Sequence, residues 1–311
     1  KQAMRRTVGL GVLLIGSFLL IEGLPISFYA RYSYRLLKKV GESSAEQTHL
    51  LHAQSLVRDV DLLIHEMEKE IRHTTDTVDR IEVSQDSSAY QILSSVLQRF
   101  PAFKRLIILD ESGRILFALP RDPTLIGTYA SREGYYSISL RTGEAYWSDS
   151  YLSPSDRKPT LFLAVRGVAR TAVGFLNLEP LSVLVSKHDY GRSSAAGIVD
   201  RSGVVIAHTD PLLARQRENL GGRASIQAAL GGAEGSFREL EWEERILRTV
   251  AIVPQTGWVV FIQQPEKEVF ASVRQLTSVV HIAILLLVAA TVIIIIILHL
   301  WIARPIKQLV Q

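Results

Sequence analysis

The sequence predicts an α+β fold, in which a long N-terminal helix is followed by two antiparallel-sheet modules and the whole is flanked by two transmembrane helices. Three observations predict it: an apolar run near each end, a helical apolar stripe, and a strand–turn–strand unit that occurs twice. The apolar residues recur every three or four positions in the first part of the chain. Beyond it they gather in short strand-like runs, which marks the change from helix to sheet.

The composition bounds the function. The chain has 311 residues, a net charge of +4 and no long basic tract, so we expect no nucleic-acid partner. It has no cysteine, which excludes disulfides, thiolate metal sites and a cysteine nucleophile. Because the chain begins at Lys1 and ends at Gln311 inside a helical pattern, we expect it to be a fragment of a longer protein.

The two apolar runs have the length of membrane spans. Residues 7–30 carry one charge, Glu22, and exceed a hydrocarbon core of roughly 30 Å. Residues 278–302 contain an unbroken isoleucine run and end near Trp301, which suits the membrane interface. We expect residues 1–6 to be a cytoplasmic N-terminus and both termini to lie in the cytoplasm. The long loop between the spans would then face the outside of the cell.

Residues 31–87 are predicted to form a long stalk helix. Its apolar stripe has steps of three, four or seven and consists of Leu56, Val60, Leu63, Met67, Ile71, Val78 and Ile81. The segment from Gly41 to Ser44 is a candidate break or cap. The stripe has two interpretations, which the sequence leaves open: it can face its own domain, or it can face a second copy in a coiled-coil seam.

A repeated unit follows the stalk. Residues 108–116 read as a strand, a turn with Asp110 and Gly113, and a returning strand. The same pattern returns in residues 198–206 with Asp200 and Gly203. Two copies of one strand–turn–strand pattern indicate two copies of one module, at residues 88–190 and 191–277.

These features resemble a double Cache domain, the extracytoplasmic sensor of many bacterial receptors. The resemblance covers about residues 32–274 and is carried by the long helix, the duplicated hairpin, the runs 146–151 and 159–161, and the closing run 257–260. It implies two PAS-like modules, the first membrane-distal and the second membrane-proximal, and a homodimer. Residues 303–311, which include Pro305, resemble the start of a HAMP linker.

The resemblance places a ligand pocket in the first module. Aromatic side chains would wall it, and an arginine would hold a carboxylate with two hydrogen bonds. The alternative is that these aromatics are core. The candidate binding residues are Tyr129, Arg132, Tyr135, Tyr136, Trp147, Asp149 and Tyr151.

The same resemblance suggests which ligand to expect. Where amino-acid-binding members carry an arginine and two aspartates, this chain has Glu133, Ser153 and either Phe175 or Asn177. A buried ammonium group without a carboxylate partner is strongly disfavoured. The sequence therefore predicts a small carboxylate or an uncharged metabolite in preference to an amino acid.

No catalytic motif, metal site or cofactor site is recognised, and His208 and Arg223 in the second module are expected to be structural. The predicted function is a transmembrane signal receptor in the inner (plasma) membrane, with a small-molecule ligand and a cytoplasmic output module. Histidine kinase is the first expectation for that output, followed by diguanylate cyclase and chemoreceptor, so whether the full-length protein is an enzyme stays open. The alternative is a membrane-anchored ectoenzyme or assembly protein that uses the helices only as tethers.

Overall fold

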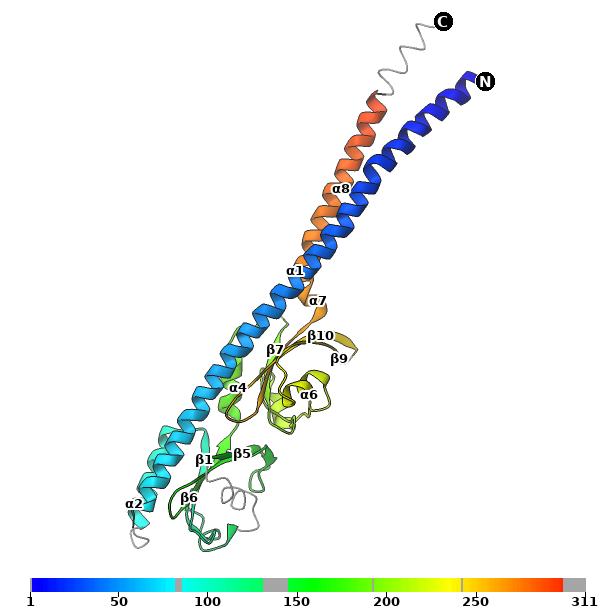
Figure 1. Cartoon of the computed structure of the whole chain (residues 1–311). Coiled ribbons are helices and arrows are strands. Elements are labelled where there is room, and N and C mark those ends of the chain that lie inside the picture. Colours follow the sequence, from blue (N-terminus) through cyan, green and yellow to red (C-terminus); the bar gives the residue numbers. More distant parts are fainter. Residues whose placement is uncertain (1, 82–85, 131–144, 192, 242, 299–311) are drawn as a thin grey trace. The chain divides into compact units, whose positions relative to one another are not determined.

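The computed structural model describes residues 2–81, 86–130, 145–191, 193–241 and 243–298 (Figure 1). For residues 2–24, 26–27, 86–87, 272–277, 280, 295 and 298 it describes the backbone only. The chain divides into a terminal unit, residues 1–45 with 267–311, and a central unit, residues 46–266.

Helix α1 runs from Gln2 to Asp79 and passes through residues 41–44 without the break that the sequence suggested. One glycine costs a helix only about 1 kcal/mol. The neighbouring residues are good helix formers, and Lys38 forms an i,i+4 ion pair with Glu42 at 3.8 Å that supports the helix at this point.

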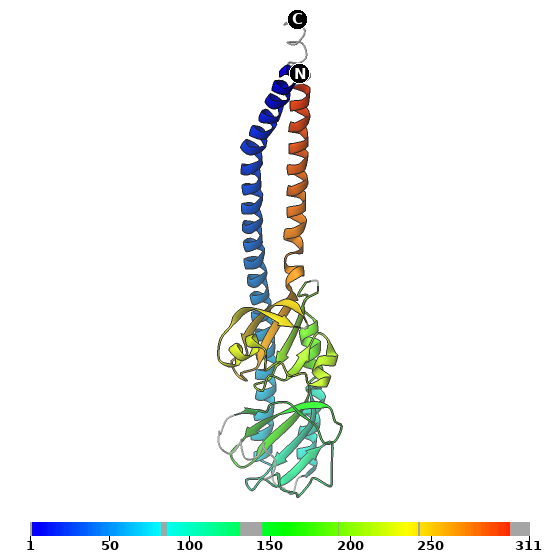
Figure 2. The same cartoon turned by 90° about the vertical axis from the view of Figure 1, so that its right-hand side faces the viewer.

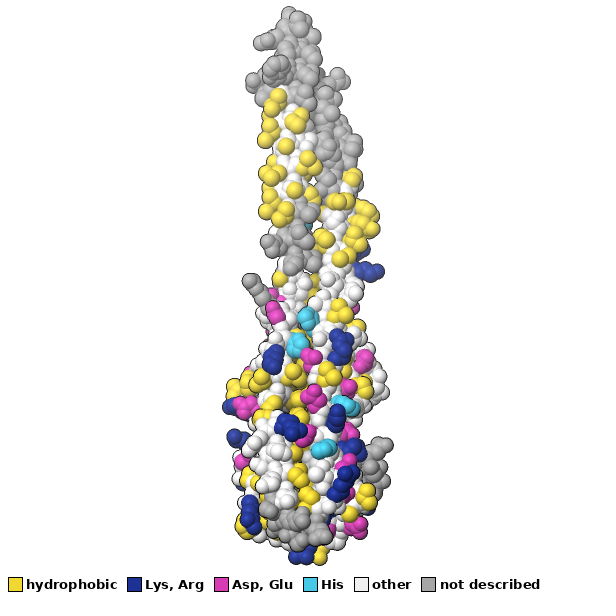
Figure 3. All heavy atoms as spheres, turned by 90° about the vertical axis from the view of Figure 1, so that its left-hand side faces the viewer, with side chains coloured by type: hydrophobic (Ala, Val, Ile, Leu, Met, Phe, Trp, Pro, Cys, Tyr) yellow, Lys and Arg dark blue, Asp and Glu magenta, His cyan; other side chains and the backbone are white. Residues whose placement is uncertain are grey.

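Helices α7 (Glu266–Val269) and α8 (Ala271–Leu298) close the described chain. Apolar side chains are exposed along α8 and appear yellow in Figure 3. Val279, Ile282 and Leu285 are among the exposed residues of this helix. Within the residues searched, no helix reaches the combined length and apolarity that a bilayer crossing requires. The spans expected at residues 7–30 and 278–302 stay predictions.

The first module contains a helix and one antiparallel sheet. Its elements are α2 (Asp86–Arg99), β1 (Phe103–Leu109), β2 (Ile115–Leu119), β3 (Tyr146–Trp147), β4 (Tyr151–Leu152), β5 (Pro159–Arg166) and β6 (Thr171–Asn177). The strand order is β2-β1-β6-β5-β3, and β4 also pairs with β5.

The second module repeats this plan. Helix α4 (Glu179–Ser186) leads from the first module into it. The elements of the second module are β7 (Ala195–Val199), β8 (Val205–His208), α5 (Pro211–Gln216), α6 (Ala224–Leu230), β9 (Gly235–Glu241), β10 (Glu244–Ile252) and β11 (Val259–Pro265). The strand order β8-β7-β11-β10-β9 matches that of the first sheet position by position. Both hairpins even shift register at the same place, after Ile108 in one and after Ile198 in the other. The predicted α+β fold with a long helix and two antiparallel sheets is confirmed.

The apolar stripe of α1 faces its own domain. Leu56, Val60, Met67, Ile71 and Val78 are all buried in one core cluster that includes residues of both sheets. Figure 2 shows this part of α1 running beside both sheets of the central unit. Each fully buried side chain of this kind contributes about 1.5–3 kcal/mol relative to exposure, so the stripe fixes the helix to the sheets.

Candidate functional site

The candidate site is one face of the first sheet. Side chains alternate along a strand, so Leu161 and Leu163 of β5 point into the core beneath α1, whereas Phe162 and Ala164 point to the other side. We call this other side the aromatic face. Its members come from five strands and are Arg105, Ile107, Tyr146, Tyr151, Phe162, Ala164, Val173 and Phe175.

Phe162 lies at the centre of the aromatic face. Its ring centroid is 6.0 Å from that of Tyr146 and 6.2 Å from those of Tyr151 and Phe175. Phe162 is 7% exposed, and its three ring neighbours are half-buried. Aromatic walls with a few polar groups are the usual lining of a small-molecule site.

A cation and an anion lie together at the edge of this face. Arg105 is directly opposite Phe175 in the β1–β6 register, and its Nη2 is 3.9 Å from Oδ2 of Asp122. Hydrogen bonds from the hydroxyl and backbone N–H of Thr124 lower the pKa of Asp122, and Arg105 lowers it further. The pair is therefore ionised at neutral pH and can offer opposite charges to a ligand that carries both.

The structure divides the residues that the sequence singled out. Tyr151 lies on the aromatic face, and Tyr129 is 63% exposed beside β2, where it bridges to Arg114. Arg132, Tyr135 and Tyr136 lie outside the described residues, and their role stays a prediction. Trp147 and Asp149 point elsewhere.

Trp147 and Asp149 join the first module to the second. The Trp147 ring is buried and meets Trp258 edge to face, with ring centroids 5.6 Å apart. Asp149 accepts a hydrogen bond of 3.0 Å from Nε of Arg201. Their side chains thus have partners in the other module.

Ser150 forms several hydrogen bonds across this junction. Its backbone N–H and its hydroxyl both donate to Oδ2 of Asp200, at 2.8 and 2.7 Å. Its carbonyl accepts from Nη2 of Arg217 at 2.6 Å. Asp200 is fully buried, so its carboxylate depends on these donors in place of water.

The second module closes the equivalent face with charged residues of its own. Phe162 pairs with Phe175 across β5–β6, and the matching pair across β10–β11 is Arg248 with Gln263. Arg248 is 0% exposed.

Two carboxylates neutralise that buried arginine. Arg248 donates to Glu239 at 2.8 Å and to Glu241 at 2.6 Å, and Arg223 pairs with Glu241 at 3.3 Å. Burial lowers the pKa of Arg248, and both carboxylates oppose that shift. Arg223 is thus part of a structural network. His208 is buried against Phe261, and burial lowers its pKa.

Sequence reasoning missed Arg105, Asp122, Phe162 and Tyr146 as members of one site. The usable signal was the strand period of two residues in β1 and β5, because successive side chains of a strand point to opposite faces of the sheet. This period places Arg105 and Phe162 on the face opposite to the core-facing positions. Asp122 carried no such signal. No group of three or more His, Cys, Asp or Glu residues that could hold a metal ion occurs in the part of the chain that the structure describes.

Comparison with known proteins gives the following similarities. A model of the Cache domain family, dCache_1, matches residues 33–273, and no curated protein matches the chain. Among solved structures, the ligand-binding domain of Mlp24 with asparagine is 17% identical, with a TM-score of 0.56, covering 76% of this chain and 99% of that one. The ligand-binding domain of the Pseudomonas fluorescens chemoreceptor CtaA with L-isoleucine is 12% identical, with a TM-score of 0.57, covering 76% and 98%. The extracellular domain of mmHK1S-Z2, named as a histidine kinase, is 14% identical, with a TM-score of 0.61, covering 73% and 99%.

These neighbours correct one prediction. The sequence-based preference for a small carboxylate or an uncharged metabolite over an amino acid is wrong, because neighbours with this fold hold asparagine and L-isoleucine. That preference was based on the alignment with amino-acid-binding members of the family, in which this chain lacks an aspartate at each of two positions. One of them, Ser153, bonds Ser155 in a turn, and another, Phe175, lies on the aromatic face. Asp122, whose carboxylate lies 3.9 Å from Arg105, comes from a loop that the motif alignment did not include.

Proposed function

This chain belongs to the Cache family, and on that premise we propose that it is the sensor of a transmembrane receptor that binds its ligand at the aromatic face of the first module. The observation that carries the proposal is the Arg105–Asp122 pair beside a half-buried aromatic cluster. The equivalent face of the second module is filled by Arg248 and its carboxylates, which favours the first module as the binding module.

The proposed ligand is an α-amino acid, like those held by the neighbours. Arg105 can exchange Asp122 for the ligand's carboxylate, and Asp122 can then accept from its ammonium group. Such an exchange keeps every charge paired, as burial of a zwitterion requires. The aromatic rings would contact an apolar side chain of the ligand. Tyr129, Arg132, Tyr135 and Tyr136 remain proposed contacts on the basis of the family resemblance.

The route for the signal is the segment from β3 to β4. Tyr146 and Tyr151 face the binding side, and Trp147, Asp149 and Ser150 between them contact the second module. A ligand that moves the two tyrosines therefore moves the junction as well. The ligand can shift the equilibrium between two arrangements of the domain only by the difference between its binding free energies for them. A tenfold difference in affinity corresponds to about 1.4 kcal/mol.

The membrane and output assignments complete the proposal. We propose that residues 7–30 and 278–302 span the inner membrane, that the Cache domain lies outside the cytoplasm, and that residues 303–311 begin a HAMP linker. Chain continuity supports the connection, since β11, α7 and α8 follow one another with almost no loop. The output module is proposed to be a histidine kinase first, and a diguanylate cyclase or chemoreceptor next, by analogy with the family.

Calorimetric titration tests the ligand class. The full chain in lipid nanodiscs is titrated with each of the common L-amino acids in turn, and we expect saturable binding of at least one. Arg105→Gln should weaken that binding at least tenfold, since a hydrogen bond to a charged group contributes about 1.5–3 kcal/mol.

The matched control is Arg58→Gln, which removes an exposed arginine of α1 away from the sheet. It should leave the affinity unchanged. Absence of binding for all the amino acids, or equal losses in the two variants, contradicts the proposed site.

A further inference from the structure

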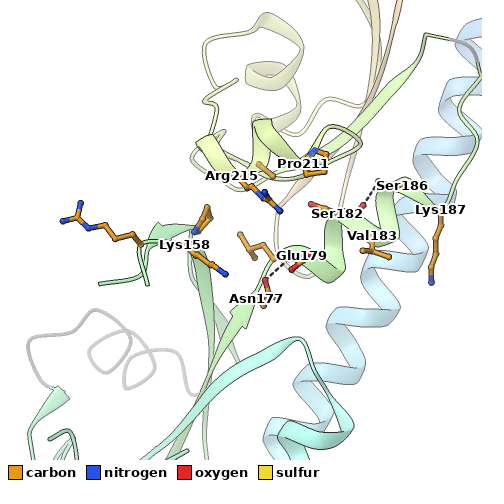
Figure 4. A pocket seen from close by; sticks show the side chains of 13 residues that line it. Lys158, Asn177, Glu179, Ser182, Val183, Ser186, Lys187, Pro211 and Arg215 are labelled. Atoms are coloured by element: carbon orange, nitrogen blue, oxygen red, sulfur yellow. Dashed lines mark hydrogen bonds between the residues drawn. The ribbon is translucent and has the colours of Figure 1, made fainter. Parts of the chain in front are cut away.

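A cavity lies where the two modules meet, away from the aromatic face. It has a volume of about 700 Å³. Its walls come from the turn before β5, the end of β6 and α4 on one side and from α5 on the other (Figure 4). Cavities of about 300–1,000 Å³ are typical of small-molecule sites.

The lining of this cavity is strongly cationic. Among the described residues that line it, Arg157, Lys158, Lys187 and Arg215 are cations and Glu179 alone carries a carboxylate. Figure 4 shows Lys158 and Arg215 directed into the cavity from opposite walls, whereas Lys187 points away from it. Within the described residues, the side chains of Lys158 and Arg215 have no carboxylate within ion-pair distance.

The remaining surface of the cavity is largely apolar. Its apolar lining residues are Pro159 of β5, Leu178 between β6 and α4, Val183 of α4, and Pro211 and Ala214 of α5. Two cations on opposite walls of a cavity with a largely apolar lining fit an organic anion that has acidic groups at both ends and a carbon skeleton between them. A single inorganic ion would leave the apolar lining without a contact.

We propose that this cavity binds a small organic anion with at least two acidic groups, which bridges Lys158 of the first module and Arg215 of the second. The site is separate from the amino-acid site proposed above. An anion held by both modules stabilises whichever arrangement of the junction brings these cations to the right separation. It is therefore a second input to the same domain, coupled to the first by linkage.

Citrate is the first probe, titrated calorimetrically into the full chain in nanodiscs at an ionic strength held constant with sodium chloride. We expect saturable binding that falls at least tenfold in the double variant Lys158→Gln/Arg215→Gln, because each lost charge-assisted hydrogen bond contributes about 1.5–3 kcal/mol. Inorganic phosphate, which cannot span the cavity, should bind at least tenfold more weakly than citrate.

Three further variants make the test specific. Glu179→Gln should tighten citrate binding about two- to threefold, because it removes the one repelling carboxylate. Arg245→Gln, which removes an exposed arginine of β10 outside the cavity, should change nothing. Arg105→Gln should also leave citrate binding intact, which separates this site from the amino-acid site.

The proposal is overturned by any of three results. The first is no citrate binding beyond the chloride-matched baseline. The second is an equal loss in Arg245→Gln and in the double variant. The third is weaker citrate binding in Glu179→Gln. Lys158, Glu179, Arg215 and Arg245 are exposed, so the melting temperatures of their variants without anion should match that of the parent chain, and their binding data can then be compared directly. Arg105 is half-buried, so the melting temperature of Arg105→Gln is measured before its citrate binding is compared.

Discussion

The two modules share one strand order and one hairpin but differ on the sheet face away from α1. At the same register position, the first sheet has Phe162 beside Phe175 and the second has Arg248 beside Gln263. In the second module Arg248 is paired with Glu239 and Glu241 at this position. In the first, half-buried rings lie beside the Arg105–Asp122 pair. The proposed binding face therefore belongs to the first module, and the matching face of the second is built around a buried ion-pair network.

The hairpin turns of the two modules are also alike in structure but differ in one contact. Oδ1 of Asp110 accepts from the N–H groups of Ser112 and Arg114 at 2.8 and 2.9 Å, and Oδ1 of Asp200 accepts from the equivalent N–H groups at 3.0 Å each. Both turns place a glycine at φ 81°, which only glycine adopts readily. Asp200 differs because its second oxygen binds Ser150 of the first module.

The largest expected effect is the loss of the buried arginine. Arg248→Ala leaves the largely buried Glu239 without its arginine and Glu241 with Arg223 alone, and we expect a loss of about 3–5 kcal/mol in the free energy of unfolding. Denaturant unfolding of the full chain in detergent measures it, with Arg245→Ala as the exposed control, expected to lose under about 0.5 kcal/mol. Similar losses in both variants would mean that the network does not hold the second face closed.

The paired aspartates give the next effect. Asp200→Ala removes the acceptor of buried donors in both modules, and we expect a loss of about 3 kcal/mol in the free energy of unfolding. Asp110→Ala removes the same turn contacts at an exposed position and should lose about 1 kcal/mol. The same unfolding measurement compares them, and equal losses would contradict a special role of Asp200 in the junction.

The smallest effect concerns the turn that enters β5. A hydrogen bond from Ser153 is the largest cause that lowers the pKa of Asp156, and together with the Lys158 backbone N–H and Lys104 it brings that pKa to about 2. Because the folded-state pKa is depressed below the unfolded value of about 3.9, the carboxylate stabilises the fold above pH ~4. That contribution is lost as the pH falls from about 4 toward 2.

The matching variant is Asp156→Asn. The side chain is exposed enough for solvent to screen it, so the variant should be less stable than the parent by under about 1 kcal/mol at pH 7. Unfolding curves from pH 7 to pH 2 should converge at the acidic end. A difference that persists at pH 2 would assign the effect to packing instead of charge.

The sequence predicted the parts of this molecule that depend on local pattern. The stripe of α1 and the two Asp-x-x-Gly hairpins were readable because spacing and turn chemistry specify them. The sequence left open whether the stripe meets its own domain or a second copy, and the burial of Leu56 and Ile71 resolves this for the described chain.

The site was less predictable because it depends on long-range register. Trp147, Asp149 and Tyr151 lie two residues apart, and alternation in a single strand would place them on one face. The chain leaves the sheet between β3 and β4, and Tyr151 lies on the aromatic face while the other two contact the second module. Arg105 and Phe175 are far apart in sequence and meet only through β1–β6 pairing. No local signal brings such residues together.

Hydrogen–deuterium exchange of the full chain in nanodiscs, with and without a mixture of the common L-amino acids, tests the division of labour between the modules. The account predicts slower exchange in β5 and β6, residues 159–166 and 171–177, and little change in β10 and β11, residues 244–252 and 259–265. Protection confined to β10 and β11 would contradict it.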